Sequence, residues 1–148
     1  MEYIFLVLII AIDQICKHII VSNFFLGESI PVVDGIFHIT YVLNPGAAFG
    51  IMQNMGIVFI VAAVLLVLAV FYFRHWLRKQ CFFLRLGVIS VLAGAIGNLI
   101  DRIQTGLVVD FFDFRIWPVF NIADISICVG VVAIIYALMF RKEVDDNA

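Results

Sequence analysis

Four aspartates lie at or beside the ends of long apolar segments: Asp13, Asp101, Asp110 and Asp124. A charged group near lipid is costly, so each of them needs a partner or a purpose. Asp110 and Asp124 are separated by a short connection, and two carboxylates in a partly dry site repel each other. One then holds a proton near neutral pH while the other stays ionised. Such a pair activates water with one member and protonates a leaving amine with the other, as in aspartic peptide hydrolysis.

The rest of the sequence offers no comparable catalytic arrangement. The histidines form no cluster, Ser90 and Ser126 lie in apolar segments without a nearby base, and neither HExxH nor a phosphate-binding glycine loop occurs. No metal and no cofactor are therefore expected. The three cysteines, Cys16, Cys81 and Cys128, lack metal-ligand spacing. They are expected to be small buried hydrophobic residues rather than a disulfide framework.

Structural explanations compete with functional ones for two of these aspartates. Asp13 and Lys17 are four residues apart, so they either form an ion pair on one helix face or help to position an outer-face structure or substrate. Asp124 follows Asn121 by one helical turn, and an acidic residue there also suits the start of a helix.

Asp101 has a different set of neighbours. It is followed directly by Arg102 and preceded by Asn98 one turn earlier, which favours a local polar network at a helix end. Arg102 is the expected ion-pair partner of Asp101. Alternatively, its fork of donors holds a peptide or a carboxylate.

Composition places these residues in a membrane protein. Hydrophobic residues make up 65% of the 148 residues and charged residues only 14%, with a net charge of -2. A soluble domain has about 25% charged residues, so lipid is expected to cover much of this chain. A basic stripe for nucleic acid is absent from the sequence.

Four segments approach the length of a membrane span: residues 3–21, 55–73, 82–100 and 123–140. The first lacks a basic leader and a small-residue cleavage site, so a span is predicted rather than a cleaved signal peptide. Arg74, Arg78, Lys79 and Arg85 flank the connection between the second and third spans, and two more cations follow the fourth. By the positive-inside rule, this connection and both termini are cytoplasmic, and loops 22–54 and 101–121 lie outside.

The outer loops carry turn and strand signals. Residues 36–44 are rich in β-branched and aromatic residues, and the stretch from Gly106 to a stop near Pro118 has the same character. A short interfacial helix is predicted over residues 47–53, after the turn at Asn44, Pro45 and Gly46. The predicted fold is a membrane all-α bundle of four transmembrane helices, with a small extracytoplasmic β-sheet and a short surface helix.

Four blocks of sequence, in this order, resemble the lipoprotein signal peptidase (signal peptidase II) family: "DQICK" from Asp13, "NPGAAFG" from Asn44, "GAIGNLIDRIQTGLVVDFFDF" from Gly94 and "FNIADIS" from Phe120. The resemblance covers nearly the whole chain. It implies a single membrane-embedded peptidase domain over residues 1–148, in a bacterial cytoplasmic membrane. It also implies an aspartic endopeptidase that cuts prolipoproteins before a cysteine carrying a diacylglyceryl group.

The resemblance also implies a role for each site residue. Asp110 and Asp124 match the catalytic aspartates, and Asp110 is preferred to Asp101 because Arg102 is the expected partner of Asp101. The substrate-positioning residues are Asn44, Asn98, Arg102 and Asn121; the supporting residues are Asp13, Lys17 and Asp101. One chain holds the whole expected site, so a monomer is expected, with prolipoproteins and membrane lipids as partners. A proton-coupled transporter and a non-catalytic lipid-binding assembly protein are the alternatives from the residues alone.

Overall fold

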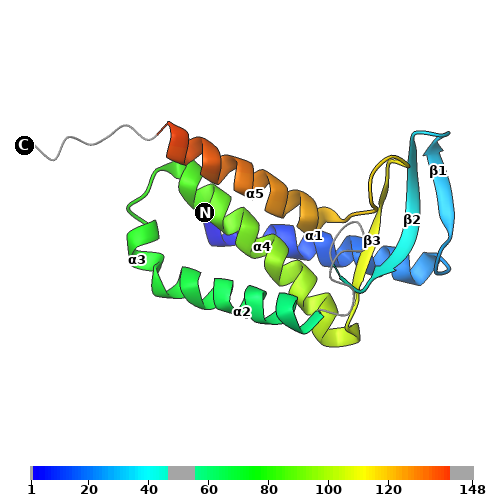
Figure 1. Cartoon of the computed structure of the whole chain (residues 1–148), viewed down its shortest axis with the longest axis horizontal. Coiled ribbons are helices and arrows are strands. Elements are labelled where there is room, and N and C mark those ends of the chain that lie inside the picture. Colours follow the sequence, from blue (N-terminus) through cyan, green and yellow to red (C-terminus); the bar gives the residue numbers. More distant parts are fainter. Residues whose placement is uncertain (1, 47–55, 141–148) are drawn as a thin grey trace, which may run out of the picture.

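The computed structural model describes residues 2–46 and 56–140. Its long helices run side by side, and a small sheet lies at one end of them (Figure 1). The predicted surface helix over residues 47–53 lies outside the described residues, as does the polar tail after Phe140.

Among the described residues, three helices are long and apolar enough to cross a membrane: α1 (Glu2–Asn23), α4 (Phe82–Thr105) and α5 (Ile122–Met139), with mean hydropathies of 2.2, 1.9 and 2.4. The predicted span 55–73 is present as α2 (Gly56–Tyr72), which has 17 residues. At about 1.5 Å per residue, α2 covers roughly 25 Å of a hydrocarbon layer about 30 Å thick. Three candidate spans are therefore found, and the count of four spans stays a prediction.

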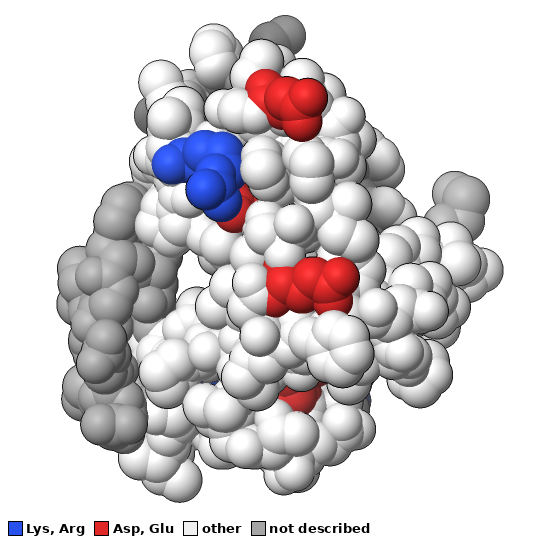
Figure 2. All heavy atoms as spheres, turned by 90° about the vertical axis from the view of Figure 1, so that its right-hand side faces the viewer, with Lys and Arg blue, Asp and Glu red and all other residues white. Residues whose placement is uncertain are grey.

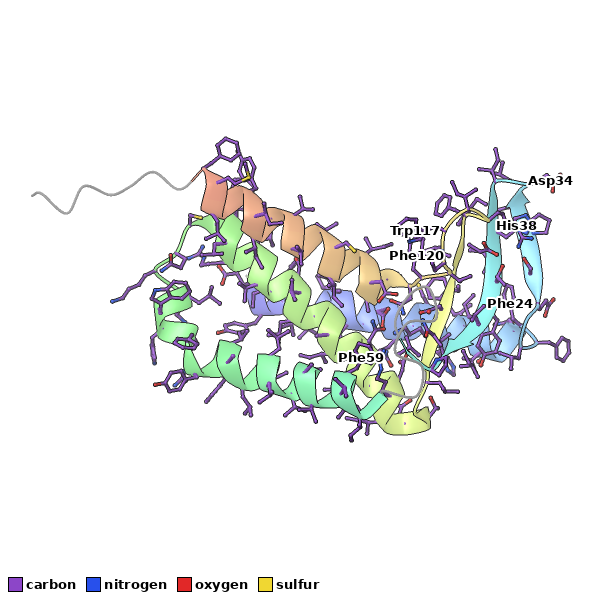
Figure 3. All side chains as sticks on the ribbon, viewed as in Figure 1. Phe24, Asp34, His38, Phe59, Trp117 and Phe120 are labelled. Atoms are coloured by element: carbon purple, nitrogen blue, oxygen red, sulfur yellow. The ribbon has the colours of Figure 1, made fainter. Side chains whose placement is uncertain are left out.

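Glycines let α4 and α5 approach closely. A Cβ added at Gly87 would lie 2.7 Å from the carbonyl oxygen of Gly130, and one at Gly94 would overlap the carbonyl oxygen of Ala123. Close backbone packing of this kind helps helices to associate in lipid. Lipid tails are as apolar as the side chains, so the hydrophobic effect does not drive the helices together there. Large apolar side chains instead project outward along the helices (Figure 3).

The sheet has the order β1-β2-β3 and is antiparallel throughout. Its strands are β1 (Ser29–Val33), β2 (Phe37–Asn44) and β3 (Val108–Asp113). The turn between β1 and β2 contains Gly35 at φ 69°, a backbone conformation that side chains disfavour. The sheet packs on the end of α1 through Ile20, Val109 and Phe111. Its outward surface is mostly uncharged, with a basic area beside separate acidic areas (Figure 2).

Three sequence predictions need correction. α4 continues to Thr105, so the first part of the predicted loop 101–121 is helical. β3 ends at Asp113, well before Pro118, because the chain turns and returns so that Phe120 pairs with Phe112. Two of the three cysteines, at positions 81 and 128, are exposed on the protein surface rather than buried, although all three are free.

A short helix, α3 (Arg74–Leu77), connects α2 to α4 at the end of the bundle opposite the sheet (Figure 1). The connection carries the cations that predicted a cytoplasmic side. The sheet and the connection thus lie at opposite ends of the bundle.

Candidate active site

Asp110 is the third residue of β3 and is 1% exposed. Its Oδ1 accepts a hydrogen bond of 2.7 Å from Asn121 Nδ2, and its Oδ2 accepts one of 2.8 Å from Asn44 Nδ2. Asn44 is the last residue of β2, two positions beyond Val42, the residue paired with Asp110. The sheet register therefore brings the Asn44 amide to this carboxyl group.

Burial is the main cause that raises the pKa of Asp110 to about 7, and the nearby charge of Asp124 adds to the effect. Hydrogen bonds from Asn44 and Asn121 oppose this rise without cancelling it. Burial removes the water that would solvate a carboxylate, so the neutral acid is favoured. Asp110 can therefore hold a proton at close to neutral pH.

Asp124 lies in the first turn of α5, where Asn121 is the N-cap. Asp124 Oδ2 accepts a hydrogen bond of 3.2 Å from the backbone N–H of Asn121, and Asn121 Oδ1 accepts one of 2.9 Å from the backbone N–H of Asp124. This reciprocal capping box fixes the Asp124 side chain at the helix start. The helix start that the sequence suggested at Asp124 is thus present, with Asn121 as the N-cap and Asp124 as its capping-box partner.

Two asparagines connect the two aspartates. Asn98, on α4, donates from Nδ2 to Asp124 Oδ1 at 2.8 Å. Its Oδ1 accepts a hydrogen bond of 3.0 Å from Asn121 Nδ2, the same group that donates to Asp110. Asn121 is fully buried. The side-chain amides of Asn98, on α4, and Asn121, the N-cap of α5, therefore hold the two carboxyl groups close together.

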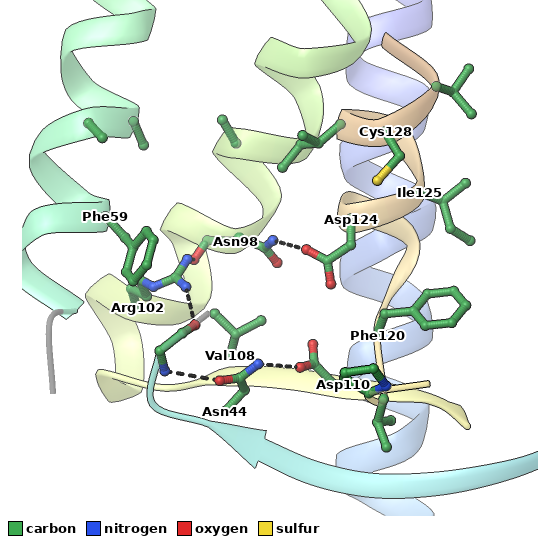
Figure 4. Close-up of a pocket in the computed structure, with 18 of the residues that line it drawn as sticks. Asn44, Phe59, Asn98, Arg102, Val108, Asp110, Phe120, Asp124, Ile125 and Cys128 are labelled. Atoms are coloured by element: carbon green, nitrogen blue, oxygen red, sulfur yellow. Dashed lines mark hydrogen bonds between the residues drawn. The ribbon is translucent and has the colours of Figure 1, made fainter. Parts of the chain in front are cut away.

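Both carboxyl groups face a cavity of about 670 Å³ (Figure 4). This volume lies within the range of about 300–1,000 Å³ that is usual for small-ligand sites. Polar side chains of Asn44, Asn98 and Arg102 line it together with the two aspartates. The remaining walls are mainly apolar and come from α2, α4, α5 and the segment before α5. The arrangement suits a reaction at a polar bond in an amphiphilic molecule.

Arg102 lies on the cavity wall, where its guanidinium group stacks on the ring of Phe59 at 4.7 Å. Its Nη2 donates to the carbonyl oxygen of Gly46 at 3.2 Å. The predicted pairing of Arg102 with Asp101 is wrong, because the ionic partner of Asp101 is Lys17. Asp110 was preferred to Asp101 as a catalytic residue because of this pairing, so that reason no longer holds. The position of Asp110 on the cavity wall supports the same choice.

The predicted ion pair between Asp13 and Lys17 is present at 2.8 Å, and it belongs to a larger buried network. Lys17 Nζ also lies 2.9 Å from Asp101 Oδ2 and donates to Asn98 Oδ1 at 3.0 Å. Asp13 Oδ1 accepts a hydrogen bond of 2.9 Å from the backbone N–H of Ala123, next to Asp124. The network lies behind the cavity and joins α1 to α4 and α5.

Two residues of the site were missed from the sequence. Gln14 donates from Nε2 to Asp101 Oδ1 at 3.0 Å and to the carbonyl oxygen of Gly97 at 3.1 Å. Its position between Asp13 and Lys17 in the polar part of the first apolar segment was the available signal. Phe59 gave no signal, since it is one apolar residue among many in the second span.

Comparisons with known proteins agree with one another. The family model described as signal peptidase (SPase) II matches residues 5–140. A lipoprotein signal peptidase of Moorella thermoacetica is 47% identical over 89% of this chain and 88% of its own length. One from Clostridioides difficile is 45% identical over 93% and 95%, respectively.

A solved structure of a bacterial membrane enzyme has the same fold. It superposes with a TM-score of 0.86 and 35% identity, covering 96% of this chain and 92% of that one. The family match, the relatives and this structure all extend over nearly the whole chain. The chain therefore belongs to the signal peptidase II family of lipoprotein signal peptidases.

Proposed function

We propose that this protein is a membrane peptidase that removes signal peptides from prolipoproteins. Its family membership supports this reaction and favours it over the transporter and the lipid-binding assembly protein. The substrate class is a prolipoprotein whose cysteine carries a diacylglyceryl group, and the cut bond precedes that cysteine. The mainly apolar walls of the cavity suit the lipid part of such a substrate.

The chemistry is that of an aspartic peptidase. The observation that supports it is the convergence of Asp110 and Asp124 on one cavity, with Asn121 hydrogen bonded to both. A water molecule between the two carboxyl groups attacks the peptide carbonyl carbon. One carboxylate takes a proton from that water, and the other carboxyl group supplies a proton to the substrate. The bond between carbonyl carbon and nitrogen then breaks, and the protonated amine leaves on the lipid-bearing cysteine.

Asp110 is the acid of this pair and Asp124 is the base. The pKa of Asp110 is raised to about 7, mainly by burial, so its carboxyl group holds a proton below that pH. Asp124 lies at a helix start, where the helix dipole favours negative charge on its carboxyl group. The assignment implies that cleavage slows as the pH rises through about 7, since Asp110 then loses its proton.

The polar residues around the cavity hold the peptide. Arg102 offers planar N–H donors and stacks on the ring of Phe59, and Asn44 lies beside Asp110, to which it donates (Figure 4). The network of Asp13, Lys17 and Asp101 supports the site from behind. We place the sheet and cavity on the extracytoplasmic side of the bacterial cytoplasmic membrane, because the basic connection lies at the other end of the bundle. Four spans then put both termini in the cytoplasm.

The test is cleavage of a diacylglyceryl-modified prolipoprotein by the purified full-length protein in a bilayer. The parent is expected to release the signal peptide, whereas Asp110→Asn and Asp124→Asn release none. Asp34→Asn is the matched control, because Asp34 is an exposed residue of the turn after β1. Cleavage by either site variant at the rate of the parent contradicts the aspartic mechanism, and an inactive parent of normal thermal stability contradicts the function.

A further inference from the structure

A second cavity lies at the other end of the bundle, away from the sheet. It has a volume of about 390 Å³ and is bounded by the end of α2, by α3 and by the start of α4. Its lining is apolar throughout; we call it the α3 groove, and its residues are Ala69, Val70, Phe73, Trp76, Leu77 and Val88. A groove of this composition between membrane helices holds a hydrocarbon chain more readily than a polar ligand.

Cations that have no acidic partner among the described residues lie next to the lining residues of the α3 groove in the chain. Arg78 and Lys79 follow α3 directly and are exposed. Arg74 donates only to the carbonyl oxygen of Phe71, at 2.9 Å, while its guanidinium group stacks on the same residue's ring. In residues 2–46 and 56–140, these three cations form no ion pair, whereas nearby Arg85 pairs with Glu2 at 2.9 Å.

The local sequence explains this imbalance of charge. Between Asp34 and Asp101 the chain contains no acidic residue at all, so the connection cannot neutralise its own cations. A ligand that combines a negative headgroup with a hydrocarbon chain satisfies both the cations and the groove. Basic pockets beside membrane helices recognise anionic phospholipids in this way.

The α3 groove lies toward the opposite end of α2 from the catalytic aspartates, although the two cavities approach each other where Leu66 and Ala69 line them. Phe59 and Phe73 lie 14 positions apart on or just after α2, which corresponds to roughly 21 Å at about 1.5 Å per residue. A single leaflet contributes only about 15 Å of hydrocarbon. The groove and the catalytic aspartates therefore face opposite leaflets.

We propose that the α3 groove binds one anionic phospholipid from the leaflet at this end of the bundle. An acyl chain fills the groove, and the phosphate lies against Arg78 and Lys79. One face of α2 lines both cavities, with Phe59, Ala63 and Leu66 at the active site and Ala69 and Val70 at the groove. The lipid thus fixes the end of the helix whose other end supports Arg102.

Native mass spectrometry of the full-length protein in detergent tests this proposal without measuring cleavage. The probes are phosphatidylglycerol and phosphatidylcholine with identical acyl chains. Phosphatidylglycerol is expected to bind at one site, and the double variant Arg78→Gln, Lys79→Gln to weaken it about 25-fold, taking a factor of about five for each cation near an anionic lipid. The control Arg115→Gln removes a cation that pairs with Asp113 of β3, at the other end of the bundle, and retains binding.

A second variant tests the hydrocarbon part of the site. Val88→Phe fills the α3 groove from α4 and is expected to abolish one-site binding of phosphatidylglycerol. Equal binding of the two lipids, unchanged binding by the Arg78 and Lys79 double variant, or an equal loss in the control overturns the proposal. So does full binding by Val88→Phe.

Discussion

Replacing Asp110 by Asn is expected to stabilise the folded protein more at pH 8 than at pH 5. The neutral amide resembles the protonated acid in size and charge, but it cannot ionise. Asp110 has a pKa of about 7 in the folded protein, raised mainly by burial from 3.8. Between pH 3.8 and about pH 7, the folded state keeps a proton on Asp110 that the unfolded chain has already lost. The parent therefore loses stability as the pH rises from about 4 to about 7, and the variant lacks this loss.

The size of the effect follows from the two pKa values. Each pKa unit corresponds to about 1.4 kcal/mol, so the full interval is equivalent to about 4 kcal/mol. The unfolded chain is already largely ionised at pH 5, which leaves about 2–3 kcal/mol of the change between pH 5 and pH 8. For a chain of this length, that change corresponds to a relative shift in Tm of roughly 5–10 °C.

The assay is thermal unfolding in detergent at several pH values between 5 and 8, followed by tryptophan fluorescence. Asp113→Asn is the control, because Asp113 lies on the same strand with a different titration. Burial raises its pKa, but hydrogen bonds from Arg115 and Thr40 outweigh burial, and the net pKa is lowered. The ionised Asp113 carboxylate stabilises the folded state fully at any pH above 3.8, the pKa of Asp113 in the unfolded chain. The difference in Tm between Asp113→Asn and the parent therefore stays constant from pH 5 to pH 8. A constant difference for Asp110→Asn as well refutes the reasoning.

Three further substitutions test the parts that support the site. Lys17→Met leaves two buried aspartates without their cation and is expected to lower the free energy of unfolding by about 3–5 kcal/mol. The control Lys79→Met, at an exposed cation, should leave Tm unchanged. Equal Tm values for the two variants contradict a stabilising role of the network. Gly94→Ala drives a Cβ into a backbone carbonyl of α5 and should lower the free energy of unfolding by about 1–3 kcal/mol. In the control Gly56→Ala, the new Cβ makes only an ordinary contact of 3.6 Å with the carbonyl oxygen of Gly106. Similar losses of Tm in the two variants count against close packing of α4 on α5. Arg102→Lys keeps the charge but loses the planar stack, so kcat/KM should fall roughly tenfold with an unchanged Tm; full activity shows that the planar group is dispensable.

The long helices and two of the three strands, β2 and β3, were predictable because they rest on local patterns, whereas β1, which contains Pro31, was not predicted. The apolar segments set the positions of the helices to within a few residues, except at the end of α4. There, Asp101 and Arg102 were read as loop because they are charged. The helix continues through them, since Lys17 neutralises the first and Phe59 stacks on the second. Both partners come from other helices, and a single sequence gives no direct sign of such contacts.

The site residues were predictable as a set, but their pairing was not. Adjacent residues suggested that Asp101 pairs with Arg102, yet successive residues on a helix point in different directions. Asn98 and Asp101 do lie on one face, as expected from their spacing, and both contact Lys17. The link from Asn121 to Asp110 depends on how β3 meets the start of α5, which only the folded structure defines.

The hydrogen bond between Asp13 and the backbone of Ala123 bears on how the protein is made. Its two residues are 110 positions apart, so a growing chain inserts its first helix long before the partner has been synthesised. The nearby Lys17 pairs with Asp13 within the same helix, which lets this helix enter the membrane with its charges already matched. The cavity, in contrast, needs α5, the last helix of the described chain. A nascent chain halted before α5 is thus inserted but lacks the cavity, and proteolytic activity begins only after α5 has been made.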